Sequence, residues 1–124
     1  MAEKTILIVD DSITMRKILK HHLTQIGYSN IKEAPNGAEG LKKLEEEEIN
    51  LIICDWNMPE MNGLQFLHTV RAIDNYQNIP IVMVTTVNTQ DEVMAALKAG
   101  ASSYITKPFS KEDLKTKINQ LLNE

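Results

Sequence analysis

Four short apolar segments of this sequence each end on side chains that could take part in phosphate chemistry. The first two end on carboxylates, the third on hydroxyl groups and the fourth on an ammonium group: 6–9 before Asp10 and Asp11, 51–54 before Asp55, 81–84 before Thr85 and Thr86, and 104–106 before Lys107. Short apolar runs are typical of buried parallel strands. Ligands of open α/β sheets bind beyond the carboxyl ends of such strands, so parallel strands would gather these side chains at one edge.

The three carboxylates indicate a bound cation. Asp10, Asp11 and Asp55 would repel one another at a shared edge unless a positive charge lay among them. A site made of oxygen ligands suits Mg²⁺, which usually binds phosphate oxygens as well. The three histidines show no metal-ligand spacing and are expected on helix surfaces: His21, His22 and His68. The sequence therefore predicts a Mg²⁺ site that handles a phosphoryl group.

Strand-like and helix-like patterns alternate along the whole sequence. Strands are expected at 6–9, 28–34, 51–54, 79–84 and 104–106, and apolar residues at helical spacing predict helices over 15–26, 38–44, 64–70, 90–99 and 114–122. This alternation predicts an α/β fold, with helices on both faces of a doubly wound five-stranded parallel sheet. The strand order 2-1-3-4-5 fits best, because it places the switch point between the strands that carry the three aspartates.

The composition is that of one ordinary domain. The chain has 124 residues, 43% of them hydrophobic and 24% charged, and its net charge of −4 argues against nucleic acid as the main partner. No apolar stretch approaches the roughly 20 residues that cross a membrane, and no signal peptide is visible. The lone Cys54 excludes an internal disulfide and fits a reducing compartment. We expect a cytoplasmic single domain over 1–124, without membrane insertion.

These motifs, in this order, resemble the receiver domain of two-component response regulators. The likeness covers the whole chain and rests on six pieces: Asp10-Asp11, Asp55, Met58-Pro59, Gly63, Thr85 and Lys107-Pro108. Each piece alone is weak evidence, but together, at the ends of the expected strands, they are highly specific. The stretch 54–63 is most similar to the single-domain receivers of bacterial chemotaxis.

The resemblance implies a role for each residue of the site. Asp55 would accept the phosphoryl group, Lys107 would neutralise its oxygens, and Thr85 would form a hydrogen bond to one of them. The Mg²⁺ would be held by four residues: Asp10, Asp11, Asp55 and, through its backbone carbonyl, Asn57. Simpler roles compete with these, because aspartate and Ser12 are good helix caps and threonine is a common strand residue.

The same resemblance implies a switch that signals by binding. A histidine kinase would phosphorylate the chain, a phosphatase could act on it, and the partner would be the flagellar motor switch. Thr85 would be the switch residue, and the output face would present four further residues: Val93, Tyr104, Thr106 and Lys117. We expect a monomer without an output domain. Val87 stands where the best-known chemotaxis receivers carry glutamate, so we expect altered dephosphorylation.

Other functions fit parts of the pattern. A phosphorelay intermediate, or a single-domain receiver outside motility, would use the same residues. A Mg²⁺-dependent aspartyl phosphatase of the haloacid dehalogenase type needs a second acid two residues after the nucleophile, where this chain has Asn57. A flavodoxin-like electron carrier would place the flavin phosphate after the first strand, where Asp10 and Asp11 would repel it. We therefore expect no enzyme activity beyond the chain's own phosphoryl transfer and dephosphorylation.

Overall fold

The computed structural model describes residues 4–86 and 89–122 as one sheet flanked by helices. In chain order its elements are β1 (Thr5–Val9), α1 (Ile13–Ile26), β2 (Asn30–Ala34), α2 (Gly37–Glu46), β3 (Leu51–Asp55), α3 (Gly63–Arg71), the 3₁₀ helix η1 (Asp74–Tyr76), β4 (Ile81–Thr85), α4 (Gln90–Lys98), β5 (Ser103–Thr106) and α5 (Lys111–Leu122). The sheet is parallel, with the strand order β2-β1-β3-β4-β5. The predicted doubly wound fold and strand order are confirmed.

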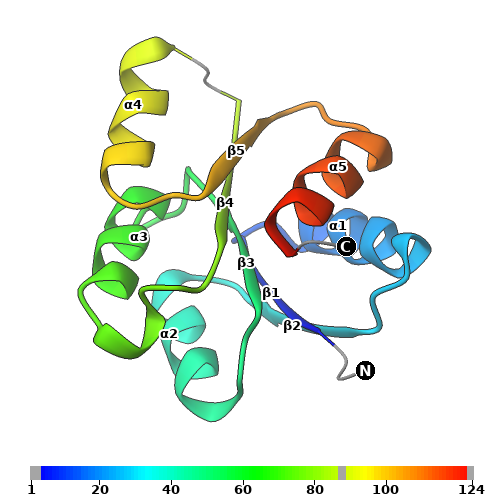
Figure 1. Ribbon diagram of the computed structural model, residues 1–124, viewed down its shortest axis with the longest axis horizontal. Helices are drawn as coiled ribbons and strands as arrows, with labels where there is room; N and C mark the ends of the chain where they lie inside the picture. The colour runs from blue at the N-terminus through cyan, green and yellow to red at the C-terminus, as the bar shows by residue number, and fades with distance from the viewer. Residues whose placement is uncertain (1–3, 87–88, 123–124) are drawn as a thin grey trace.

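Helices cover both faces of the sheet (Figure 1). α1 and α5 lie on one face, and α2, α3 and α4 lie on the other. Successive residues of a strand point to opposite faces, so Ile6 and Ile8 of β1 join the apolar cluster under α1 and α5, whereas Leu7 and Val9 join the cluster under the other helices. Because β1, β3 and β4 are buried on both faces, they read as continuous apolar runs.

Two predicted strands begin two residues later in the structure, whereas the bounds of the other three differ by a single residue. β2 begins at Asn30 rather than at residue 28, because Gly27 and Tyr28 complete the end of α1: both backbone N–H groups donate to the carbonyl of Leu23, at 3.1 and 2.9 Å. β4 covers 81–85 rather than 79–84. The 3₁₀ helix at 74–76, which the apolar spacing does not predict, occupies part of the connection before it.

Side-chain caps fix where the loops near the carboxyl edge of the sheet turn into helices. Ser12 caps α1, and Asn62 forms a reciprocal capping box with Gln65 at the start of α3. A second capping box begins α5: Ser110 Oγ accepts from the Asp113 N–H at 3.0 Å, and Asp113 Oδ2 accepts from the Ser110 N–H at 3.1 Å. Among the helices described, none is long and apolar enough to cross a membrane.

Candidate functional site

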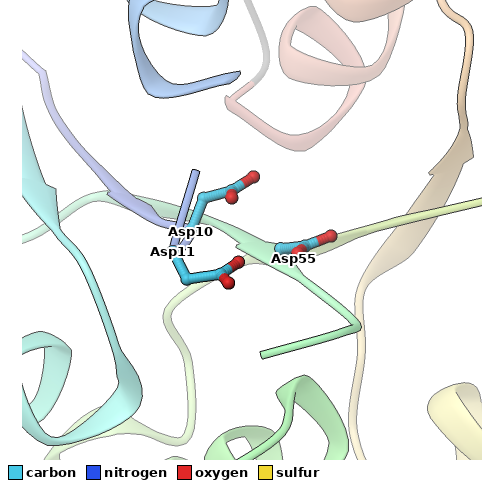
Figure 2. A group of neighbouring side chains, drawn as sticks. All are labelled: Asp10, Asp11 and Asp55. Atoms are coloured by element: carbon cyan, nitrogen blue, oxygen red, sulfur yellow. The ribbon is translucent and has the colours of Figure 1, made fainter. Parts of the chain in front are cut away.

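The register of the sheet places the acidic residues side by side. Val9 of β1 pairs with Cys54 of β3, so Asp10 and Asp55 end neighbouring strands at the same level. Ligand oxygens of Asp10, Asp11 and Asp55 lie within 4.8 Å of one another. Figure 2 shows the three carboxylates together at the carboxyl ends of β1 and β3. The structure therefore brings together the acidic residues that the sequence placed at this edge.

Asp10 is the most buried of the three acids. Its side chain is almost fully covered, and Oδ1 accepts from the Ser12 N–H at 2.8 Å. Oδ2 is buried without a hydrogen-bond partner in the described part of the chain. Burial is the largest effect on the pKa of Asp10 and raises it, and the negative charges of Asp55 and Asp11 add to this rise. The hydrogen bond from the Ser12 N–H and the positive charge of Lys107 oppose it. A buried carboxylate oxygen of this kind requires a proton or a cation.

Asp55 lies between the other acids and an ammonium group. Its carboxylate is buried, and Oδ1 accepts a hydrogen bond of 3.0 Å from Lys107 Nζ. Lys107 follows β5, and its backbone N–H donates to the carbonyl of Thr85 at 2.8 Å. The Lys107–Pro108 peptide bond is cis. One positive group therefore contacts the carboxylate to which the resemblance assigns phosphorylation.

Gly63 holds the loop after Asp55 against the end of β3. Its N–H donates to the carbonyl of Trp56 at 2.8 Å. A Cβ atom on Gly63 would collide with the carbonyl oxygen of Asp55 and with the Cα of Trp56, both of which belong to the backbone. Only a residue without a side chain permits this approach. Asn57, the fourth expected metal ligand, lies exposed on the same loop.

The donor set fits a hard divalent cation. The three clustered side chains offer oxygen ligands only, and Asp10 Oδ2 lacks a partner within the described residues. Asp11 is exposed, which leaves part of the cluster open to water, and Mg²⁺ usually keeps several waters. When bound, Mg²⁺ would neutralise the clustered charges and bind phosphoryl oxygens.

Thr85 connects this site to the neighbouring edge of the sheet. It is buried at the end of β4, one residue beyond the Val84 that pairs with Asp55. It pairs with Thr106 of β5, directly before Lys107. A displacement of Thr85 would therefore reach both the site and β5.

The structure gathers three of the four predicted output residues. One groove between β5 and α5 is lined by these three: Tyr104, Thr106 and Lys117. Lys117 Nζ lies 5.7 Å from the centre of the Tyr104 ring, within the range of a cation–π contact. Val93 is half-buried on α4 and does not line the groove. Val87, which we relate to dephosphorylation, lies outside the described residues.

Arg16 contacts the site, although no functional role was predicted for it. Its Nη1 donates to the backbone carbonyl of Asp10 at 2.6 Å, and its Nε donates to Glu33 Oε1 at 3.2 Å. Glu33, on β2, also pairs with Lys20 at 3.6 Å. The available signal was an arginine six residues after Asp10, but sequence spacing does not reveal a contact to a backbone carbonyl.

Comparisons with known proteins agree on one family. The family model of the response regulator receiver domain matches residues 6–119. The chain is 48% identical over 118 residues to a chemotaxis protein CheY homolog of Campylobacter jejuni, which covers 94% of this chain and 91% of that protein. It is 47% identical to chemotaxis protein CheY1 of Helicobacter pylori, over 94% and 95% of the two chains.

The structural match extends over nearly the whole chain. The solved structure of chemotaxis protein CheY4 from Vibrio cholerae superposes with a TM-score of 0.91 at 34% identity, and the match covers 97% of this chain and 99% of that one. The region matched by the family model, residues 6–119, includes Lys107 and every residue of the acidic cluster. The chain therefore belongs to the response regulator receiver domain family.

Proposed function

We propose that this chain is a phosphorylation-activated switch whose acceptor is Asp55. The observation that carries this proposal is the convergence of Asp10, Asp11 and Asp55 at one edge, with Lys107 Nζ 3.0 Å from the acceptor carboxylate. Phosphoryl transfer depends mainly on positioning and on neutralisation of charge, and this site offers both. The donor is a histidine kinase, as expected for the receiver family.

The proposed transfer needs no further acid or base from the chain. A carboxylate oxygen of Asp55 attacks phosphorus, the P–N bond of the phosphohistidine breaks, and the leaving imidazole nitrogen takes up a proton from water. Lys107 exchanges its contact with the Asp55 carboxylate for one with a phosphoryl oxygen. Asp10, Asp11, Asp55 and the Asn57 carbonyl would hold Mg²⁺, which would supply further neutralisation of the phosphoryl charge. The chain then acts as a switch rather than as a phosphatase with an external substrate, because Asn57 offers an amide where such an enzyme needs an acid.

The output of the proposed switch runs through Thr85. Its hydroxyl gains a contact with the phosphoryl group only in the phosphorylated state, and such a differential contact is what a shift of populations requires. Tyr104 then turns inward and reshapes the face that carries Val93, Thr106 and Lys117. The groove that three of these residues line supports this face as a binding surface.

The proposed partner is the flagellar motor switch, and the proposed location is the cytoplasm. The relatives from Campylobacter jejuni and Helicobacter pylori are named as chemotaxis proteins, which supports a role in motility. A fully buried Cys54 thiol suits a reducing compartment. Measured binding of a purified motor switch protein should increase when beryllofluoride, an acyl-phosphate mimic, and Mg²⁺ are added. Unchanged binding would reject the motor partner and favour a phosphorelay role.

Labelling by radioactive acetyl phosphate tests the acceptor. Wild type should be labelled with Mg²⁺ and should lose labelling in EDTA. Asp55→Asn should abolish labelling, because the amide cannot form the acyl phosphate. Asp74→Asn, which changes an exposed aspartate of η1, should label like wild type. Labelling of Asp55→Asn at the wild-type rate would contradict the proposal.

A further inference from the structure

Three hydrogen bonds hold Asp10, one each at its backbone N–H, its carboxylate and its backbone carbonyl. The Asp10 N–H donates to the Ala34 carbonyl of β2 at 3.1 Å, which continues the sheet by one residue. The Asp10 carboxylate accepts from the Ser12 N–H at 2.8 Å. The third contact is the 2.6 Å bond from Arg16 Nη1 to the Asp10 carbonyl. Of these three bonds, only the one from Arg16 has a side-chain donor, and only this one acts on the carbonyl of the Asp10–Asp11 peptide group.

Arg16 can serve this purpose because its guanidinium is itself anchored. The Arg16 side chain is 14% exposed, and Nε donates to Glu33 Oε1 at 3.2 Å. Glu33 belongs to β2, and its other oxygen lies 3.6 Å from Lys20 Nζ. The planar guanidinium therefore binds a strand residue through one nitrogen and the Asp10 carbonyl through another, an arrangement that a lysine ammonium cannot reproduce with the same geometry.

A contact to the Asp10 carbonyl controls the position of Asp11. The peptide unit is planar, so the direction of the Asp10 carbonyl also fixes the Asp11 nitrogen and Cα. Asp11 is exposed and follows the last residue that the sheet holds, so it has fewer packing contacts than Asp10 to fix it. Arg16 is thus placed to determine where the Asp11 carboxylate lies relative to Asp10 and Asp55.

The contact acts on geometry more directly than on charge. The charges that shift the pKa of Asp10 come from Asp55, Lys107 and Asp11. The positive charge of Arg16 is paired with Glu33. A role for Arg16 in this site should therefore depend on the shape of its side chain and not only on its charge.

We propose that Arg16 is a positioning residue of the Mg²⁺ site: anchored on Glu33, it orients the Asp10–Asp11 peptide group so that both carboxylates meet Asp55. This inference rests on the proposed function, because it concerns the same site. The competing view is that Arg16 only ties α1 to β2. That view predicts lower stability in Arg16 variants without a selective loss of metal affinity.

Mg²⁺ titration of the lone tryptophan, Trp56, separates the two views. Wild type, Arg16→Lys and Arg16→Gln are titrated with MgCl₂, and their unfolding by urea is measured in EDTA. Both variants should bind Mg²⁺ about tenfold more weakly than wild type, the lower end of the losses caused by changing residues that orient metal ligands. Arg16→Lys keeps the charge, so a loss in this variant identifies the guanidinium geometry as the cause.

Two further variants serve as controls. Lys20→Gln removes the other cation on Glu33 without touching Asp10, and should bind Mg²⁺ like wild type. Glu33→Gln keeps an acceptor oxygen but removes the charge that anchors Arg16, and should bind with an affinity between those of Lys20→Gln and Arg16→Lys. If the Arg16 variants do not fold, Glu33→Gln decides the matter, because wild-type affinity in that variant would overturn the proposal.

The remaining outcomes are also distinguishable. If wild type and both Arg16 variants bind Mg²⁺ equally, the positioning role is wrong, whereas the proposed metal site stands. If the Arg16 variants lose stability in EDTA at unchanged Mg²⁺ affinity, Arg16 is a structural tie and the proposal is again wrong. If wild type itself shows neither a fluorescence change nor stabilisation by Mg²⁺, the proposed metal site fails together with this inference.

Discussion

Two regions of the molecule each contain a buried polar atom without a hydrogen-bond partner among the described residues: Oδ2 of Asp10 at the carboxyl edge of the sheet, and Nδ1 of His22 between α1 and the start of α5. Both environments disfavour the charged form. Burial raises the pKa of Asp10 and lowers the pKa of His22. The same lack of a hydrogen-bond partner therefore occurs at a group that ionises to an anion and at a group that ionises to a cation.

The neighbours of the two atoms differ. Asp10 lies beside Asp11 and Asp55, and ligand oxygens of the three residues lie within 4.8 Å of one another. His22 lies edge-on against the Phe109 ring, with 6.2 Å between ring centres, and the charges near it are those of His21 and Lys111. A neutral imidazole can remain in such a contact, whereas clustered carboxylates require a cation. A buried polar atom thus indicates a ligand site only where other ligand atoms converge on it.

The largest effect that we predict tests whether the backbone around Asp55, at the carboxyl edge of the sheet, is held rigidly in place. Gly63→Ala should lower the free energy of unfolding by about 1–3 kcal/mol, because the new methyl group meets the backbone of Asp55 and Trp56, which cannot move aside without disturbing β3. Urea unfolding in EDTA measures the loss. Mg²⁺ affinity should fall as well, since Asp55 is displaced.

Gly37→Ala is the matched control for this change. Gly37 and Gly63 both begin a helix directly after an asparagine cap. A Cβ on Gly37 would meet the side chain of Met61, which is flexible and can move. The stability loss in Gly37→Ala should therefore be clearly smaller. Equal losses in the two variants would show that the backbone of Asp55 and Trp56 moves aside for a methyl group as easily as the Met61 side chain does.

An intermediate effect is expected at Asp10 itself. In EDTA at neutral pH, Asp10→Asn should raise the free energy of unfolding by about 1 kcal/mol, because the variant buries no unpaired charge. Asp11→Asn should raise it less, since Asp11 is exposed. Mg²⁺ should stabilise Asp10→Asn less than wild type, because one ligand is lost. Thermal unfolding with EDTA and with Mg²⁺ measures both quantities.

The pH dependence of this gain has a defined sign. The pKa of folded Asp10 lies above its ordinary value of 3.8. Between the two values the folded protein binds the proton more strongly than the unfolded chain, so wild-type stability falls as pH rises through that window. The advantage of Asp10→Asn should therefore be full above the raised pKa and should shrink as pH falls towards 3.8. An advantage independent of pH would contradict this explanation.

The extent to which sequence predicts the site follows from the kind of contact involved. Asp10, Asp55 and Lys107 follow apolar strands, and the edge of a parallel sheet collects such residues whatever the details of packing. Gly63 is part of the motif that carries the resemblance, but its role, like that of Arg16, depends on contacts with backbone atoms, which residue types alone do not show. His22 was expected on a helix surface, but the buried side of its ring depends on how α5 crosses α1, which local spacing does not specify.

The smallest predicted effect concerns His22. Its pKa is lowered by burial and by the charges of His21 and Lys111, so the unfolded chain takes up a proton near the ordinary value of 6.5 before the folded protein does. Stability should therefore fall as pH decreases from about 6.5 to the lowered pKa, and stay constant above that window. Because the ring is partly exposed, solvent screening keeps this change below about 0.5 kcal/mol.

Replacement of the ring should remove that slope. Urea unfolding of His22→Gln between about pH 5 and 7, the range in which histidines titrate, should show a weaker pH dependence than wild type. His68→Gln, which changes an exposed histidine of α3, should keep the wild-type slope. Addition of Mg²⁺ should leave the His22 slope unchanged, because the described ring contacts and charges at His22 come from His21, Phe109 and Lys111, none of which is a proposed metal ligand. A slope at His22 that disappears with Mg²⁺ would mean that the seam between α1 and α5 is coupled to the carboxyl edge, and the two buried atoms would then belong to one region rather than two.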